Sequence, residues 1–265
     1  MRKSEVKLFA LSDLHLAHTV DKPMTIFGEK WNNHTQLIEK SWQETVTDED
    51  VVILGGDISW GKSLDEALAD LHFIDKLPGQ KLLLRGNHDY WWTSLRKMKE
   101  LCDQENLHTL HFLRNNTLAF GSFLIGGTRG WLLPDDDEFT AQDQKIFDRE
   151  LIRMQLSLDE MKQVKKKSAS ALTQVFTMHY PPISANGTSS KMSDLLSAAE
   201  IPLCIFGHIH HELPYYLSSP QLDKVRYVLT SADQLNFIPV LLGEDGSLRD
   251  FDNLTADKFK AGKDI

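Results

Sequence analysis

The stretch VKLFALSDLH, residues 6–15, contains the pattern that decides the fold of this chain. Its first part, Val6–Leu11, is almost wholly apolar, which predicts a short strand buried on both faces. Two side chains of the kind that hold metals, Asp13 and His15, stand directly after this strand. A buried strand that ends in such side chains predicts a site at the strand's carboxyl end.

The same arrangement occurs four more times along the chain. Ligands of open α/β sheets bind at the carboxyl ends of the strands. Any one of these motifs is weak evidence by itself, but their agreement predicts that five loops meet at one site. The four further apolar runs and the polar residues that follow them are Val51–Leu54 before Gly56-Asp57, Lys81–Leu84 before Arg85-Gly86-Asn87-His88-Asp89, Thr173–Met178 before His179, and Leu203–Phe206 before Gly207-His208-Ile209-His210.

Helical patterns alternate with the strands in the first half of the chain. Apolar spacing predicts helices around 38–45, over 64–74 and after Asp89, and Ser63 with Glu66 forms a capping box before the second. The richer strand content of the second half favours a mixed α/β fold over a purely doubly wound one. No repeat or linker divides the chain, so residues 1–265 are expected to form a single domain. Further strands are expected at 109–113, 123–126, 225–229 and 237–242.

The segment from about 131 to 168 departs from this alternation. An acidic run at 135–138 is expected to be a solvated loop, because the spacing of a calcium-binding loop is absent. Apolar residues over 147–161 then recur at helical spacing, and a second capping box, Ser157 with Glu160, leaves open whether one helix or two follow. The segment is either a helix packed on the surface of the domain or a lid over the site.

Composition excludes several classes of protein. The chain has 265 residues, 41% hydrophobic and 25% charged, which is typical of globular proteins. Its formal net charge of −9 argues against general binding of nucleic acids or anionic membranes. The N-terminal stretch lacks the apolar region of a signal peptide. The longest stretch without Asp, Glu, Lys or Arg is 168–190. It contains two prolines and many polar residues, so it is not expected to span a membrane. Two cysteines, Cys102 and Cys204, are too few for a disulfide scaffold, so we expect a cytoplasmic protein.

The sequence resembles the calcineurin-like metallophosphoesterase superfamily, and five motifs carry this resemblance. The motifs follow one another in the order of that family: D-x-H at 13–15, G-D at 56–57, G-N-H-D at 86–89, a later histidine at 179 and G-H-x-H at 207–210. The segment 21–34 and the overall layout are also similar to uncharacterised bacterial predicted phosphohydrolases. The resemblance implies an α/β fold, a four-layer α/β/β/α sandwich of two mixed sheets flanked by helices, with a metal site at the carboxyl ends of the strands.

The resemblance also implies two metal ions, each divalent or trivalent. Imidazole nitrogens combined with carboxylate and amide oxygens suit Mn, Fe or Zn better than Ca or Mg. Two such cations about 3.5–4 Å apart share a hydroxide and lower its pKa toward neutrality. Since Asp57 belongs to both ligand sets, it would bridge the two ions. The implied ligands are Asp13, His15, Asp57 and His210 for the first ion, and Asp57, Asn87, His179 and His208 for the second.

Other side chains near the motifs are candidates for catalysis and substrate binding. By the resemblance, His88 would protonate or stabilise the leaving oxygen. Asp89 either orients His88 or caps the helix that follows. A guanidinium matches the oxygens of a phosphate, so Arg85 and Arg129 are candidates for binding substrate, with ordinary salt bridges as the alternative. Protein phosphatases of the family carry Asp-Arg-Gly after the second motif; this chain has Ile58-Ser59-Trp60-Gly61 there, which argues against that class.

These observations predict a phosphoesterase that depends on two metal ions and hydrolyses a phosphomonoester or phosphodiester by attack of a metal-bridging hydroxide. The expected substrate is a phosphorylated small molecule. A non-catalytic scaffold that binds a partner protein is the main alternative, and the presence of all seven candidate ligands argues against it. A lipid-precursor pyrophosphatase also begins Ser-Asp-x-His-Leu, but it would need 147–161 as an apolar lid. The oligomeric state stays open. Several aromatic residues flank the motifs and either stack on the base of a nucleotide substrate or pack in the hydrophobic core. They are Trp60, Tyr90, Trp91, Trp92 and Trp131.

Overall fold

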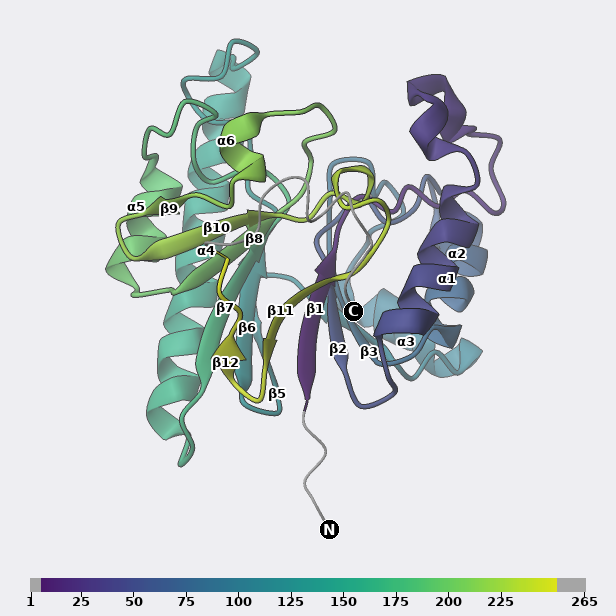
Figure 1. The fold of residues 1–265 in the computed structure, drawn as a ribbon, viewed down its shortest axis with the longest axis horizontal. Coiled ribbons are helices and arrows are strands. Elements are labelled where there is room, and N and C mark those ends of the chain that lie inside the picture. The colour runs from purple at the N-terminus through teal and green to yellow at the C-terminus, as the bar shows by residue number, and fades with distance from the viewer. Residues whose placement is uncertain (1–5, 252–265) are drawn as a thin grey trace.

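Two six-stranded sheets pack face to face, with helices on both outer surfaces (Figure 1). The computed structural model describes residues 6–251. Residues 1–5, which begin the N-terminal stretch where no signal peptide is expected, lie outside the described residues. Apolar side chains fill the space between the sheets and the space under each layer of helices. The expected four-layer α/β/β/α architecture is therefore confirmed.

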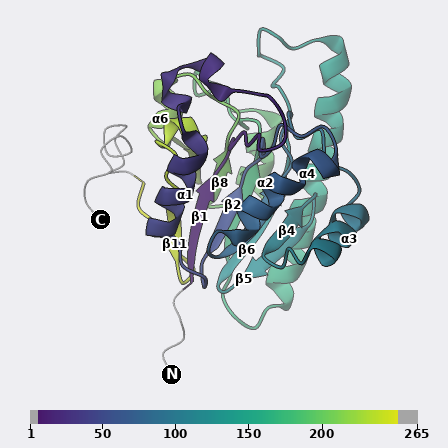
Figure 2. The same ribbon diagram turned by 90° about the vertical axis from the view of Figure 1, so that its right-hand side faces the viewer.

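The first sheet has the strand order β12-β11-β1-β2-β3-β4. Strands β1 to β4 are parallel, and β11 and β12 add antiparallel strands beyond β1. Three helices connect the parallel strands and cover the outer face of the sheet (Figure 2). The strands are β1 (Lys7–Leu11), β2 (Val51–Leu54), β3 (Gln80–Leu84), β4 (Leu110–Leu113), β11 (Val240–Glu244) and β12 (Ser247–Leu248), and the helices are α1 (His34–Thr45), α2 (Leu64–Lys76) and α3 (Leu95–Glu105).

The second sheet has the strand order β5-β6-β7-β8-β10-β9, with parallel strands from β6 to β10 and an antiparallel strand at each edge. Its central strands are buried along almost their whole length because both faces are covered. In β8, Leu203 and Ile205 face the other sheet, whereas Cys204 and Phe206 face the helices. The elements are β5 (Thr117–Phe120), β6 (Phe123–Thr128), β7 (Thr173–Met178), β8 (Leu203–Phe206), β9 (Gln221–Leu222), β10 (Val225–Leu229), α4 (Ala141–Lys167), α5 (Lys191–Ala198) and α6 (Pro214–Leu217).

Helix α4 is one continuous helix, so the second of the two capping boxes seen in the sequence is not a helix start. Thr140 caps α4 together with Asp143. Ser157 is instead buried inside the helix, where its hydroxyl donates to the carbonyl of Asn116 and accepts from the amide of Gly127. The apolar stripe that includes Phe147 and Met161 packs on the second sheet. Its role is therefore structural, and a gating role for 131–168 stays a prediction.

A few element boundaries differ from the sequence predictions. The third helix begins at Leu95 and is capped by Ser94, six residues after Asp89. The last predicted strand begins at Val240 instead of 237, because Asn236 and Phe237 have left-handed φ angles of 51° and 61° that break an extended run. The short edge strands β5, β9 and β12 were not predicted.

Two further expectations bear on the class of protein. Both cysteines are buried and unpaired within residues 6–251. Over the same residues, no helix combines the length and the apolar character needed to cross a membrane.

Candidate metal centre

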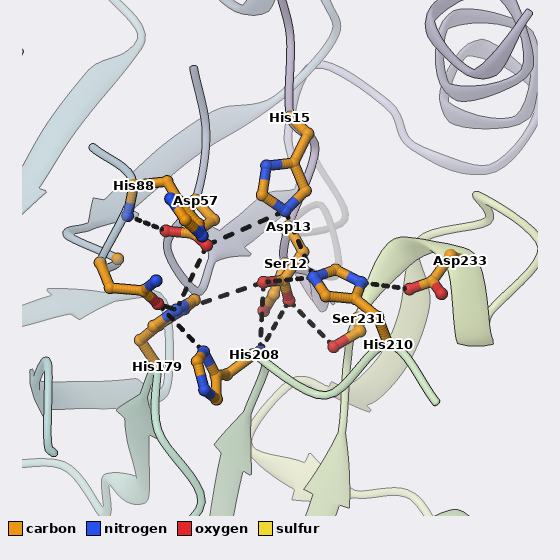
Figure 3. Close-up of polar contacts among 12 residues, drawn as sticks. Ser12, Asp13, His15, Asp57, His88, His179, His208, His210, Ser231 and Asp233 are labelled. Carbon is orange, nitrogen blue, oxygen red and sulfur yellow. Dashed lines mark hydrogen bonds and ion pairs between the residues drawn. The ribbon is translucent and has the colours of Figure 1, made fainter. Parts of the chain in front are cut away.

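The predicted metal ligands come together where the strands of both sheets end. Figure 3 shows six of them, Asp13, His15, Asp57, His179, His208 and His210. The seventh, Asn87, contacts His179 and His208. A first group of donor atoms contains Asp13, His15, Asp57 and His210. The Nε2 atoms of His15 and His210 face each other at 3.3 Å. His15 Nε2 lies 3.8 Å from Asp57 Oδ2, and His210 Nε2 lies 3.7 Å from Asp13 Oδ1. Donor atoms of Asp13, His15 and His210 all lie within 4.8 Å of one another, which is close enough to surround one cation.

A second group of donor atoms adjoins the first and shares Asp57 with it. Asp57 Oδ2 lies 3.5 Å from His179 Nε2. The amide oxygen of Asn87 lies 2.6 Å from that same His179 nitrogen and 3.0 Å from His208 Nδ1. The two groups therefore meet at a single carboxylate oxygen, which faces a histidine nitrogen on either side.

Four of these residues have left-handed backbone conformations. Asp13, His15, Asp57 and His208 have φ angles of 59°, 47°, 51° and 71°. Such a conformation costs a non-glycine residue about 1–2 kcal/mol. It persists only where the surrounding structure enforces it, and it concentrates at functional sites. The strand ends are thus held in turns that an unconstrained chain would avoid.

Burial shifts the pKa values of Asp13, Asp57, His15, His179 and His208 away from their charged forms. For His210, burial acts in the same direction, but the hydrogen bond to Asp233 and the charge of Asp13 outweigh it and raise the pKa. Burial raises the pKa of Asp13 to about 8, and the neighbouring Asp57 raises it further while His210 opposes. Burial lowers the pKa of His179 to about 3 and that of His208 to about 2. Buried carboxyl oxygens and imidazole nitrogens held this close together form a donor set that a cation would compensate. The set of nitrogen and oxygen donors fits Mn, Fe or Zn.

Three side chains that sequence reasoning missed hold the candidate ligands in place. Asp233 Oδ1 lies 3.0 Å from His210 Nδ1, which leaves His210 Nε2 facing the first group. The ammonium of Lys30 donates to the other oxygen of Asp233. Ser231 donates to Asp13 Oδ2 at 2.9 Å. A signal for Ser231 and Asp233 was present, since the predicted strand 225–229 leads into Thr230-Ser231-Ala232-Asp233, whereas no such pattern indicates Lys30.

His88 lies against the cluster without taking part in either group. Its backbone amide donates to Asp57 Oδ1 at 2.7 Å. Its ring packs against Trp60, with centroids 4.6 Å apart, and lies 5.8 Å from the ring of His15. Its Nδ1 is buried and has no hydrogen-bond partner among the described residues. The ring is therefore close to the centre and has a nitrogen available for other chemistry.

Asp89 has neither of the two roles expected for it. Its carboxylate accepts from the Trp91 indole and from four backbone amides, those of Gly86 and of residues 57–59, at 2.7–3.2 Å. Both oxygens are occupied by these donors, so Asp89 does not orient the His88 ring. Helix α3 begins too far along the chain for Asp89 to cap it. Asp89 instead ties the loop after β3 to the loop after β2.

Arg85 and Arg129 lie beside the centre and line one cavity of about 300 Å³. Arg129 forms a salt bridge, which was the alternative to substrate binding: its Nη2 lies 3.8 Å from Oε1 of the buried Glu150. The guanidinium of Arg129 also lies 4.4 Å from the centroid of the Trp131 ring. Its backbone carbonyl accepts from the amides of His179 and Tyr180. The two arginines thus lie next to loops that carry candidate ligands, but they do not belong to either group of donor atoms.

The aromatic residues near the loops divide into two kinds. Trp91 and Trp92 are buried in the hydrophobic core, so they serve packing, and Trp92 also lines the cavity that contains Arg85 and Arg129. Trp60 stacks on the ring of His15 at 4.9 Å. Tyr90 is 58% exposed beside His88, and it is the one member of this set that offers a largely free ring surface.

Comparison with known proteins gives a family match and several structural likenesses. Residues 6–212 match the family model described as calcineurin-like phosphoesterase. The Gene 66 protein of Mycobacterium phage L5 is 35% identical over 78 residues, which cover 29% of this chain and only 37% of the phage protein. The crystal structure of TT1561 of Thermus thermophilus has a TM-score of 0.55 at 12% identity, over 90% of this chain and 98% of that chain. The phosphopantetheinyl hydrolase of Mycobacterium tuberculosis has a TM-score of 0.50 at 15% identity, over 84% and 88%. At such identities the likeness shows a shared fold.

Proposed function

The chain belongs to the calcineurin-like phosphoesterase family, and from that premise we propose that it is a phosphohydrolase that uses two metal ions to hydrolyse a phosphomonoester or phosphodiester. The observation that carries the proposal is the pair of donor groups that meet at Asp57. Asp57 Oδ2 faces His15 Nε2 at 3.8 Å and His179 Nε2 at 3.5 Å. A carboxylate in that position suits two cations better than one.

The side chains of the two groups would hold these ions. We assign Asp13, His15, Asp57 and His210 to one ion, and Asp57, Asn87, His179 and His208 to the other. When bound, a pair of Mn, Fe or Zn ions lowers the pKa of water toward neutrality and neutralises the oxygens of a phosphoryl group. The imidazoles of His15, His179 and His208, whose pKa values burial lowers, present lone pairs. Asp233 fixes the ring of His210 from behind.

We assign to His88 the transfer of a proton to the leaving oxygen. Its ring lies 5.8 Å from the ring of His15 and has a buried, unpartnered Nδ1. Its backbone amide is bonded to the shared ligand Asp57, which fixes its position relative to the centre. A positioned histidine of this kind contributes about 10²–10⁴-fold to a rate.

The substrate we propose is a phosphorylated small molecule. The phosphate-binding arginine of protein phosphatases is missing after Gly56-Asp57, so a protein substrate is disfavoured. Tyr90 beside His88 could stack on a base, which keeps nucleotides among the candidates. Phosphopantetheinyl esters belong in the same screen, because a protein named for hydrolysing them shares this fold. A non-catalytic scaffold would have no need of seven intact donors and His88.

The first test is hydrolysis of p-nitrophenyl phosphate beside bis-p-nitrophenyl phosphate in Mn²⁺. We expect one ester to be hydrolysed, and we expect removal of metal by a chelator to lower the rate by roughly 100-fold or more, since the metals supply several kcal/mol. Added Mn²⁺ should restore the rate. Preference for the diester would direct the search to linear or cyclic nucleotides. Absence of hydrolysis of either ester and of a wider phosphate-ester screen, with bound metal confirmed, would overturn the proposal in favour of the scaffold.

Replacing His88 tests its role separately from metal binding. His88→Ala should lower kcat by about 10²–10³-fold, within the range for loss of a general acid, while the metal content per chain holds. The loss should be larger for phenyl phosphate than for p-nitrophenyl phosphate, because p-nitrophenolate needs little protonation to leave. His108→Ala, at an exposed histidine in the turn before β4, is the matched control. Equal losses for both leaving groups, or loss of metal, would contradict the assignment.

A further inference from the structure

Four arginines from four different elements line the cavity beside the candidate centre. Arg85 follows β3, Arg114 follows β4, Arg129 follows β6, and Arg153 lies on α4. Arg85 and Arg129 are partly buried, and Arg114 and Arg153 are exposed at the rim. Guanidinium groups repel one another, so their convergence in an acidic protein calls for an anionic counterpart.

One carboxylate, Glu150, is the only acid among the described residues that line the cavity. It is fully buried. One oxygen lies 2.5 Å from Arg153 Nη1 and 3.8 Å from Arg129 Nη2, and the other accepts from Thr128 and Gly130. Glu150 therefore has both oxygens in use, and the lining keeps a net charge of +3 from four arginines and one glutamate.

Two buried donors in this lining have no acceptor. The Nε atoms of Arg85 and Arg129 are buried and lack a hydrogen-bond partner within residues 6–251. An unsatisfied donor of this kind costs about 1–3 kcal/mol, and native structures keep few of them. Burial lowers the pKa of Arg129, Glu150 opposes that shift, and the charges of Arg85 and Arg153 add to it. A bound anion would relieve both the missing acceptors and the repulsion.

The cavity adjoins the candidate centre along two loops. Arg85 is two residues before Asn87, so their Cα atoms lie at most about 7 Å apart. The carbonyl of Arg129 accepts from the amide of His179 at 3.0 Å. A molecule with one end at the centre and the other end among the arginines would therefore need only a short connection between its two ends.

We propose that this arginine cavity binds a second phosphoryl group of the substrate, an inference that rests on the proposed function. The substrate class is then a small phosphate ester that carries another phosphate a few bonds from the one that is hydrolysed. A guanidinium fork matches phosphate oxygens with two parallel hydrogen bonds, and Asn115 and Thr93 add neutral donors to the same lining. Arg85 and Arg129 thus bind the part of the substrate that distinguishes it from a simple monoester.

Binding of inorganic phosphate to the metal-stripped protein tests the cavity without any catalysis. In that state the centre holds no cation, whereas the cavity keeps its four arginines, so phosphate should go to the arginines. Calorimetric titration at low salt with a chelator present should show one phosphate bound per chain. Arg85→Gln and Arg129→Gln should weaken it by about 10- to 100-fold, as expected for hydrogen bonds to charged groups.

Arg96→Gln is the matched control for this titration, since Arg96 lies on α3 with its side chain 81% exposed. Arg85→Gln is the more informative variant, because no hydrogen bond or ion pair of the Arg85 side chain is present within residues 6–251 and its replacement should leave the melting temperature unchanged. Phosphate affinity that is absent in the wild type, or equal in wild type and Arg85→Gln, would overturn the anion site.

The substrate class is tested with two esters that differ by one phosphate, propyl phosphate and propane-1,3-diol bisphosphate. In the Mn²⁺-loaded protein, the kcat/KM for the bisphosphate should exceed that for the monophosphate by about 10-fold or more, and Arg85→Gln should bring the ratio close to one. Phosphate binding with no preference for the bisphosphate would show that the ligand is free phosphate, which overturns the substrate assignment. If the wild type hydrolyses neither ester, nor any in the wider screen, the proposed function fails, while the titration still decides the anion site.

Discussion

Asp57→Asn should lower turnover by at least about 1000-fold and strip metal from both proposed positions at once. The reason is that one oxygen, Asp57 Oδ2, faces His15 in the first group and His179 in the second. Metal ions supply several kcal/mol to a hydrolysis, and each 1.4 kcal/mol is a factor of ten in rate. Asparagine has nearly the same shape, and its amide oxygen can still accept from the His88 amide as Oδ1 does. The fold should therefore survive.

The measurement is metal content per chain by mass spectrometry of the purified protein, together with kcat at saturating Mn²⁺ on the better ester. Asp103→Asn, at an exposed position on α3, is the matched control. If Asp57→Asn kept full metal content and wild-type turnover, the shared-carboxylate arrangement would be wrong.

Asp89→Ala should produce the largest loss of stability among the residues of the candidate site. The carboxylate accepts five hydrogen bonds, from four backbone amides and from the Trp91 indole. Alanine would leave these donors without an acceptor in a buried position, so the free energy of unfolding should fall by at least about 4 kcal/mol. Urea unfolding followed by circular dichroism measures the loss, and Asp103→Ala serves as control.

Asp89→Asn keeps the shape of the side chain and keeps the prediction testable if the alanine variant does not fold. Its amide oxygen can satisfy some of the five donors, but its NH₂ group faces others, so we expect a smaller loss of stability. Metal affinity should fall by about 10- to 100-fold, as for other groups that orient metal ligands, because Asp57 lies in the loop that Asp89 fixes. A stability for Asp89→Ala within about 1 kcal/mol of wild type would refute this role.

The central strands and the gathering of site residues could be predicted because both follow from burial. β8 is covered on both faces, which makes its sequence continuously apolar. β7 is buried at every position after the first, although it includes Gln174 and Thr177, and the predicted bounds of both strands match the observed ones. The ends of parallel strands lie along one edge of a sheet, so the polar residues after them meet. Arg85 and Arg129, both singled out in the sequence, also lie together. That they share a cavity could not be predicted, because it depends on how the two sheets pack.

The misinterpreted residues are those whose partners lie far away along the chain. Asp89 accepts from amides some 30 residues earlier, and no local pattern indicates that pairing. Ser157 resembles a helix cap, but burial against Asn116 and Gly127 places it within α4. The edge strands β9 and β12 have only two residues each, which is too short for a pattern in the sequence, and β5 is a short strand that is only partly buried. For Asp89 and Ser157, contacts with residues distant in the sequence determine the role of the side chain.

The position of β1 has a consequence for how the protein is made. β1 lies between β2 and β11, and Ser12 pairs with residues around Thr230 and Ser231 at its end. β1 is synthesised some 230 residues before β11, which at 5–20 residues per second is roughly 10–50 s earlier. During that time one edge of β1 has no native partner, and Asp13 lacks the hydrogen bond that Ser231 donates. After its synthesis, His210 still lacks its hydrogen-bond partner Asp233. Nascent chains would thus expose an unpaired strand edge of the kind that native proteins protect, and a chain could complete its centre only after Asp233 has been synthesised.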